Sequence, residues 1–151
     1  MATAEIFARL KQDHDKHRAM LAEIDTAKDG ARRDLFEAFR VEVTAHAAAE
    51  EESLYATMLA KPDLREDAQH SVSEHKEIDD FLEELDALDI ESELWTKTFG
   101  KMRHRYEHHI GEEEEEMFPD AAKELSAEEE ARIAEVFKKR KPAEIERAKQ
   151  D

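Results

Sequence analysis

The sequence predicts an all-α protein: an antiparallel up-down-up-down four-helix bundle with a short C-terminal helical appendage. Apolar residues recur at helical spacing over most of residues 4–117. Glycine and proline number only three each, which is typical of long helices rather than a sheet protein. The pattern breaks only briefly between helices, so consecutive helices should lie antiparallel. We place the bundle at residues 1–120 and the C-terminal helical extension, packed on the bundle, at 121–151.

The first two helices are expected at about 3–26 and 31–60, separated by Asp29-Gly30 and closed by Lys61-Pro62. The inward stripe of the first comprises Ile6, Leu10, His14, His17, Leu21 and Ile24. The inward stripe of the second comprises Leu35, Phe39, Val43, His46, Glu50, Leu54 (or Ser53) and Thr57. Each stripe is otherwise mostly apolar but includes residues of types that bind metals: His14 and His17 in the first, and His46 and Glu50 in the second.

The third helix is expected at about 62–88, and the fourth follows a short connection at 89–92 and ends at Pro119. Inward residues of the third are Ala68, Val72, His75, Ile78, Leu82 and Leu85. Those of the fourth are Trp95, Phe99, Met102, Tyr106, His109 and Glu113.

The C-terminal residues predict a short helix packed across one end of the bundle. Ser126 and Glu129 have the spacing of a capping box at its start. We interpret the basic run 138–141, which precedes Pro142, as the solvated end of this helix and the start of a frayed tail.

The net charge of −17 at pH 7 argues against nucleic acid and anionic membranes as partners. It fits a monomer or weak homodimer that attracts cations. No apolar run reaches membrane-spanning length, and the first residues lack the apolar segment of a secretory signal. The absence of cysteine excludes disulfides and sulfur ligands. We expect a cytoplasmic protein.

A repeated motif carries the functional signal. His109 and Glu113 stand four residues apart, and His46 and Glu50 repeat that spacing 63 residues earlier, each pair being followed by two apolar residues at matching offsets. Residues four apart lie on the same face of a helix. Each copy therefore aims an imidazole and a carboxylate in one direction.

The repeat extends to the first and third helices. His14 and His75 are 61 residues apart, and each follows an acid, Asp13 or Glu74. Two hairpins would then bring four imidazoles and two carboxylates to the bundle interior. Buried His–Glu hydrogen bonds are the alternative, but an uncompensated buried carboxylate is costly, and a shared cation explains six such groups better.

Nitrogen and oxygen donors without sulfur suit iron, manganese, zinc or cobalt. Two glutamates from different helices can bridge two ions, with two histidines left for each. Iron or manganese is favoured over zinc, which usually takes four ligands at one ion. Such a centre keeps positions for water, oxide, peroxide or a diatomic ligand.

The residues quoted resemble the hemerythrin-like HHE cation-binding domain family over about residues 5–120. The likeness rests on Asp13-His14, HAAAEEESLY from His46, Glu74-His75 and HIGEEEEEMFP from His109. The resemblance implies a four-helix bundle with a non-haem diiron (Fe-O-Fe type) centre. It implies that His14 and His46 bind one iron, that His75 and His109 bind the other, and that Glu50 and Glu113 bridge them.

The sequence departs from oxygen-carrying hemerythrins at one ligand. Those proteins have a further histidine on the third helix, whereas Ser71 and Asp79 stand four residues either side of His75. A more symmetric centre with open positions on both ions is implied, which argues against simple reversible oxygen carriage. Asp79 or His17 could replace the missing ligand, although His17 is expected to line the pocket.

The remaining polar residues have less specific expectations. Tyr55 and Tyr106 are expected in the core with satisfied hydroxyls rather than as ligands. Within the acidic run 112–116, only Glu113 should point inward. Surface positions are expected for three further histidines, His70, His104 and His108.

Two functions remain open. The first is a binding or sensing protein for O₂, NO or iron itself; the second is a diiron enzyme that decomposes hydrogen peroxide, as catalases and peroxidases do, or activates O₂. No separate substrate pocket, acid–base pair or reductase domain is evident, which favours binding, storage or detoxification over oxygenation of an organic substrate. A bundle filled structurally by zinc or manganese is a third possibility.

Overall fold

The structure is a computed structural model that describes residues 4–151, and these residues fold into helices without strands. The first hairpin pairs α1 (Glu5–Thr26) with α2 (Asp29–Glu50), and α2 continues through η1 (Glu51–Tyr55) into α3 (Ala56–Leu59). The second hairpin pairs α4 (Pro62–Ala87) with α5 (Glu93–Glu112), and α5 continues through η2 (Glu113–Met117) into α6 (Phe118–Glu124). Helix α7 (Ala127–Gln150) completes the chain.

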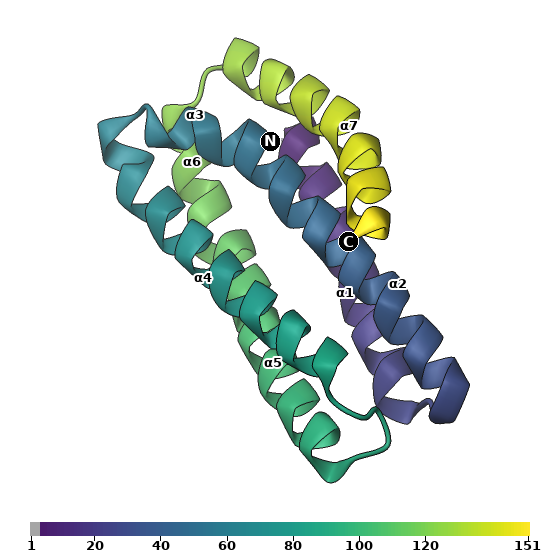
Figure 1. The fold of residues 1–151 in the computed structure, drawn as a ribbon. Helices are drawn as coiled ribbons and strands as arrows, with labels where there is room; N and C mark the ends of the chain where they lie inside the picture. Colours follow the sequence, from purple (N-terminus) through teal and green to yellow (C-terminus); the bar gives the residue numbers. More distant parts are fainter. Residues whose placement is uncertain (1–3) are drawn as a thin grey trace.

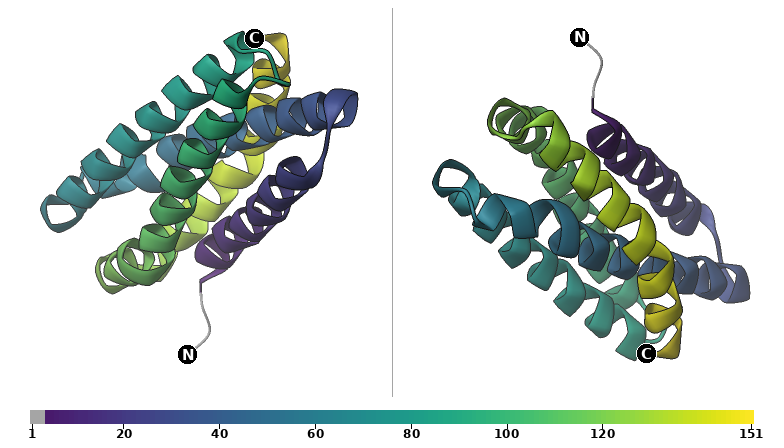
Figure 2. Two further views of the ribbon diagram at one scale, coloured as in Figure 1. Left: turned by 90° about the horizontal axis from the view of Figure 1, so that it is seen from below. Right: turned by 90° about the horizontal axis from the view of Figure 1, so that it is seen from above.

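The four long helices form the predicted up-down-up-down bundle. The hairpins α1–α2 and α4–α5 lie side by side, and α7 runs along the first of them (Figure 1). Views from above and below show α7 crossing the outer side of that hairpin obliquely (Figure 2). No helix in residues 4–151 is long and apolar enough to cross a membrane.

Local sequence signals explain most helix ends. The Ser92 hydroxyl caps α5 by accepting from the Trp95 N–H, and Pro62 opens α4, where its missing N–H needs no partner. Ser126 and Glu129 form the predicted capping box of α7. Between α1 and α2 the left-handed residue is Asp29, with φ 55°, and not its glycine neighbour.

The prediction that the fourth helical segment ends at Pro119 is wrong. Segments η1 and η2 are π-helical: η1 begins just after the inward glutamate Glu50, and η2 begins at the inward glutamate Glu113. The α-helical hydrogen bonds restart at Phe118, so Pro119 occupies the first turn of α6, where a missing N–H is tolerated. The π-helix also resolves the choice between Ser53 and Leu54, because its wider turn buries both.

The C-terminal residues form a helix packed on the bundle, as predicted, but the prediction of a short helix across one end was wrong. Helix α7 has 24 residues, contains Pro142 in its interior and packs along α2, η1 and α1 instead of across one end. Its buried stripe mixes apolar and charged residues: Ile133, Phe137, Lys141, Glu144 and Ala148. The basic run is therefore not a helix end. Lys138, Lys139 and Arg140 are exposed, as expected, but Lys141 is only 4% exposed and the helix continues past it.

The core divides into two apolar clusters along the bundle axis. One cluster joins α7, α3 and α6 to the start of α1 and includes Leu10, Leu54 and Met117. The other fills the opposite end and includes Leu21, Val43 and Ile78. Between them lies a layer of buried polar residues, which we call the polar layer and which contains His14, His46, Glu50, His75, His109 and Glu113.

Candidate metal centre

The structure brings all six sequence-predicted ligands together in the polar layer. None is more than 5% exposed, and they come from α1, α2, α4, α5 and the first residue of η2. Their ligand atoms form two overlapping groups, each within 4.8 Å: Glu50, His75, His109 and Glu113 in one, and His14, His46 and Glu50 in the other. Glu50 belongs to both groups.

The imidazoles point their Nε2 atoms at the two carboxylates. His109 Nε2 lies 2.8 Å and His14 Nε2 3.8 Å from Glu113 Oε1. His75 Nε2 lies 3.2 Å and His46 Nε2 3.8 Å from Glu50 Oε1. Each carboxylate is thus approached by one histidine from each hairpin.

Hydrogen bonding leaves this arrangement incomplete. In the part of the chain that the structure describes, five buried side-chain N and O atoms have no hydrogen-bond partner, and all five belong to the cluster: His14 Nε2, His46 Nε2, Glu50 Oε1, Glu50 Oε2 and Glu113 Oε1. Buried polar atoms in native proteins are nearly always paired, because an unpaired one costs about 1–3 kcal/mol. These atoms converge on one another, which is the arrangement that ligands of a shared cation require.

A second set of carboxylates holds the imidazoles from behind. In the first hairpin, His14 Nδ1 lies 2.8 Å from Glu114 and His46 Nδ1 lies 2.8 Å from Asp13. In the second, His75 Nδ1 lies 2.9 Å from Glu51 and His109 Nδ1 lies 2.8 Å from Glu74. An ionised carboxylate only accepts hydrogen bonds, so each Nδ1 carries a proton and each Nε2 points inward, where it presents its lone pair whenever the imidazole is neutral. Protein metal sites commonly orient their histidines in this way.

These four carboxylates follow the sequence repeat. The acid before each first-helix histidine binds the second-helix histidine of its own hairpin. The acid after each inward glutamate, Glu51 or Glu114, binds the first-helix histidine of the other hairpin. The prediction that only Glu113 of the acidic run points inward was therefore wrong, since the Glu114 side chain is only 17% exposed.

Sequence reasoning had noted Asp13 and Glu74 only as neighbours of the ligands and assigned Glu51 and Glu114 no role. The repeat itself held the signal, because each acid recurs at the same offset from its histidine or glutamate. The π-helical segments are the local cause of the geometry. Each starts at or beside the inward glutamate, and the changed turn lets consecutive glutamates both reach histidines.

Electrostatics in the metal-free protein reflect the crowding of charges. Burial and the neighbouring Glu113 raise the pKa of Glu50. Burial would lower the pKa of His109, but Glu113, together with Glu74 and Glu50, outweighs burial and raises that pKa to about 10. His75 behaves alike, with Glu50 and Glu51 raising its pKa to about 9 against the effect of burial. Protons on these imidazoles thus balance the carboxylates.

The other sequence-predicted residues lie around the cluster. His17 is buried, and both its nitrogens are engaged: Nδ1 with the Tyr106 hydroxyl at 2.7 Å and Nε2 with Glu42 at 3.1 Å. The Tyr55 hydroxyl donates to Glu113 at 3.0 Å, so both tyrosines have satisfied hydroxyls, as expected.

The two positions flanking His75 do not join either donor group. The Ser71 hydroxyl contacts Met117 Sδ at 3.7 Å, and Asp79 is exposed. The three histidines expected at the surface are exposed: His70, His104 and His108.

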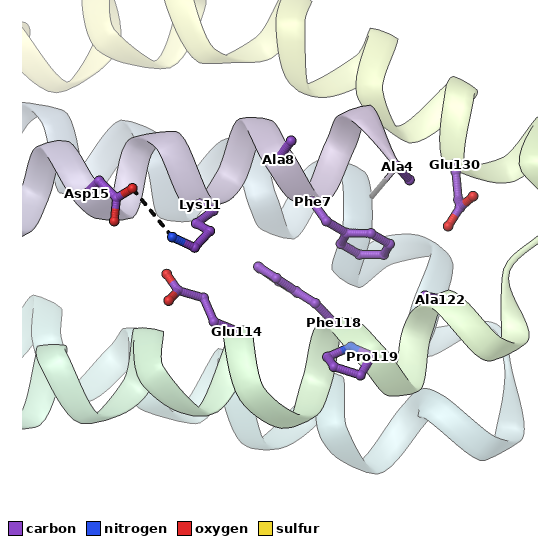
Figure 3. Close-up of a pocket in the computed structure, with 10 residues that line it drawn as sticks. All are labelled: Ala4, Phe7, Ala8, Lys11, Asp15, Glu114, Phe118, Pro119, Ala122 and Glu130. Atoms are coloured by element: carbon purple, nitrogen blue, oxygen red, sulfur yellow. Dashed lines mark ion pairs between the residues drawn. The ribbon is translucent and has the colours of Figure 1, made fainter. Parts of the chain in front are cut away.

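Three cavities lie at or near the cluster. One of about 80 Å³ lies beside Glu113 and is otherwise lined by Asp67, His70, Ser71, Glu112, Glu116, Met117 and Asp120. A space of about 10 Å³ is lined by Val43, His46, Ala47, His75, Ile78, Asp79, Tyr106 and His109. A groove of about 710 Å³ lies between α1 and the η2–α6 segment, with Phe7, Phe118 and Pro119 on its walls (Figure 3). Glu114 and Phe118 separate this groove from His14. The His14 ring stacks on the Phe118 ring, with 6.0 Å between the ring centroids.

The donor set fits a pair of cations. It offers four imidazole nitrogens and two carboxylates, each imidazole is oriented by a carboxylate, and the unpaired atoms face one another. Fold and site together define a helical bundle whose interior is built to hold cations.

Comparison with known families agrees. The family model of the hemerythrin HHE cation binding domain matches residues 5–121. The chain belongs to this family, and cation binding is accordingly its general function. No curated protein and no solved structure gives a match to the chain. The match ends before α7, which therefore lies outside the family domain.

Proposed function

We propose that the protein binds two iron ions in the polar layer and uses them to bind or sense O₂ or another small ligand such as NO. The observation that carries this proposal is the set of five unpaired buried atoms on His14, His46, Glu50 and Glu113. Bound cations would give these atoms partners. Without cations, their apolar surroundings and the hydrogen bonds already formed nearby leave them unpaired. The absence of sulfur ligands and the mixed nitrogen and oxygen donors favour iron or manganese.

In this proposal each residue has a defined role. His14 and His46 would hold one ion, His75 and His109 would hold the other, and Glu50 and Glu113 would supply carboxylate ligands shared by the pair. The four carboxylates on Nδ1 fix the imidazole rings, and the two apolar core clusters keep bulk water away. Bound iron would supply a redox-active centre with positions open to a small ligand.

The size of the inner cavity supports a small ligand. About 10 Å³ beside three of the histidines accommodates little more than a water-sized or diatomic molecule. An organic substrate would need several hundred cubic ångströms against the reactive groups, and the larger groove is separated from His14 by Glu114 and Phe118. Tyr106 lines the inner cavity, but its hydroxyl is already bonded to His17.

Metal analysis with visible spectroscopy tests the proposal. Protein purified without added metal should contain about two irons per chain and show an oxo-bridged ferric spectrum. Glu50→Ala should lose at least one iron, because Glu50 belongs to both donor groups. Glu115→Ala changes an exposed residue of the same acidic run and should keep both irons. A colourless protein holding zinc or manganese would overturn the iron assignment.

Exposure of the reduced protein to O₂ and to hydrogen peroxide separates the two uses of the centre. A stable oxygenated species supports the binding or sensing function. Rapid O₂ evolution from peroxide that is lost in Glu50→Ala would contradict it and favour a peroxide-decomposing enzyme.

A further inference from the structure

Helix α7 places a buried cation beside the candidate metal centre. The Lys141 side chain is only 6% exposed, and its Nζ lies 2.8 Å from both Asp13 Oδ2 and Glu42 Oε2. Burying a lysine is costly unless its ammonium is paired, and here two carboxylates pair it. The contact crosses from α7 to α1 and α2, so it depends on the docking of α7 against the first hairpin.

The lysine reaches a proposed ligand through a single carboxylate. Asp13 Oδ2, which accepts from Lys141, is the same atom that accepts from His46 Nδ1 at 2.8 Å. The other oxygen, Asp13 Oδ1, pairs with Arg9. Asp13 is therefore held between two cations and fixed in the position that orients the His46 ring.

The same ammonium also touches the His17 branch. Glu42 Oε2 contacts both Lys141 Nζ and His17 Nε2, and His17 in turn contacts Tyr106 at the inner cavity. Lys141 thus contacts both hydrogen-bonded paths on this side of the cluster: one through Asp13 to His46, and one through Glu42 to His17.

The second hairpin has no counterpart to this lysine. Glu74, which corresponds to Asp13 in the repeat, contacts His109 and the exposed His70 at 3.5 Å. Among the ion pairs of residues 4–151, neither Glu74 nor Glu51 contacts a lysine or arginine. The two halves therefore differ in charge. Arg9 and Lys141 pair Asp13, and Arg18 pairs Glu114, so the acids behind His46 and His14 both contact cations. Lys141 is the buried one of these three cations.

We propose that Lys141 is a positioning residue: acting through Asp13, it fixes His46 and makes the metal position of the first hairpin electron-poorer than that of the second. This inference rests on the proposed diiron function. A cation on Asp13 weakens the pull of its carboxylate on the His46 Nδ1 proton, so the imidazole is a poorer donor. Poorer donation and a nearby positive charge both favour ferrous over ferric iron.

The test is the reduction potential of the iron-loaded full chain. Lys141→Met removes the charge and keeps the length of the side chain, and it should shift the potential of the centre to lower values with a change in the visible spectrum. Lys141→Arg keeps the charge and should restore both towards wild type. Lys138→Met makes the same change at an exposed position of α7 and should have no effect.

Folding of the variant is expected to survive, because Arg9 still pairs Asp13 and Lys16 still pairs Glu42. Should Lys141→Met not fold, Lys141→Gln keeps a hydrogen-bond donor without the charge and should give the same shift. A purely structural role predicts a lower melting temperature with the wild-type potential and spectrum, which would overturn the proposal.

A measurement on the metal-free protein keeps the inference separate from the diiron function. The His46 Nδ1 proton, observed by NMR at neutral pH, should shift in Lys141→Met and stay unchanged in Lys138→Met. If wild type binds no iron, the proposed function fails, and this resonance still tests whether Lys141 positions His46. An unchanged resonance in Lys141→Met would refute that positioning.

Discussion

At the scale of single residues, the site depends on the carboxylate that accepts a hydrogen bond from Nδ1 of each imidazole. Every proposed histidine ligand is bonded at Nδ1 to a carboxylate, and these bonds select the tautomer that points Nε2 inward. Two of the four carboxylates, Asp13 and Glu74, are at most 4% exposed, so water cannot easily replace them.

The first residue-scale prediction concerns Glu74. Glu74→Gln should weaken cation binding roughly 10–100-fold at the position that uses His109, because the neutral amide no longer holds the imidazole as firmly. Competition with a chelator measures the affinity. Glu83→Gln, an exposed site on the same helix, serves as the control, and equal affinity in the two variants would contradict the orienting role.

The second concerns Gly111, between His109 and Glu113. A Cβ added at Gly111 would have no neighbouring atom within 4 Å outside its own helical turn, so packing does not require a glycine there. Gly111→Ala should therefore stabilise the protein by about 1 kcal/mol, or roughly 2–4 °C in melting temperature. Gly100→Ala, equally open on the same helix, should match it in a thermal unfolding experiment. Destabilisation or metal loss in Gly111→Ala alone would show that this position does require a residue without a side chain.

Single residues also show where prediction from sequence stops. The six candidate ligands could be found because each occupies an inward position of an apolar stripe, where a charged group needs a cause. Glu51 and Glu114 could not, because glutamate-rich runs are usually solvated and only the π-helical turns bring these two to histidines. Lys141 was missed because a lysine in a basic run before a proline is typical of a helix end.

At the scale of elements, α7 shows how tertiary packing overrides local signals. Helical spacing of Ile133, Phe137 and Ala148 continues past Pro142, but Lys141 and Glu144 interrupt its apolar character. The stripe can be buried because Asp13 and Glu42 on the facing helices pair the Lys141 ammonium. The sequence does not reveal which helices face each other. By contrast, the four bundle helices were predictable, since their stripes are long and their breaks are marked by proline, serine or aspartate.

The element-scale prediction concerns Pro142. Proline inside a helix lacks the N–H that would bond the carbonyl four residues earlier, and it costs up to about 3 kcal/mol. Its side chain is exposed, so Pro142→Ala should raise the free energy of unfolding measured with denaturant. The capping residue Ser126, changed to Ala, should lower it by about 1 kcal/mol. A less stable Pro142→Ala would mean that α7 needs a bend there to seat Lys141.

At the scale of the whole molecule, charge and fold are linked through the polar layer. The protein carries a net charge of −17, and within its interior the metal-free form balances buried carboxylates by protonating His75 and His109. The folded pKa values of about 9 and about 10 lie above the ordinary 6.5. These two histidines therefore stabilise the metal-free fold below pH 6.5, and that contribution is lost as pH rises through 9 to 10.

The molecule-scale prediction is proton release on metal loading. A ligand imidazole must be neutral at Nε2, so binding near pH 7.5 should expel about two protons, those held by His75 and His109. Apparent affinity should fall as pH is lowered. Calorimetry in buffers of different ionisation enthalpy counts the protons, and Glu50→Ala, which should lose an ion, should release fewer. A heat of binding independent of the buffer would exclude this exchange.

The crossed pattern of Nδ1 bonds has a consequence for assembly. His14 is oriented by an acid of the second hairpin, and His75 by an acid of the first, so neither half of the chain contains a finished coordination pocket. Separately expressed halves should each bind metal cations poorly and regain tight binding only once recombined. Cation binding is then a late step on the folding pathway, reached when the halves dock, and a nascent chain would carry no preformed site for a free cation.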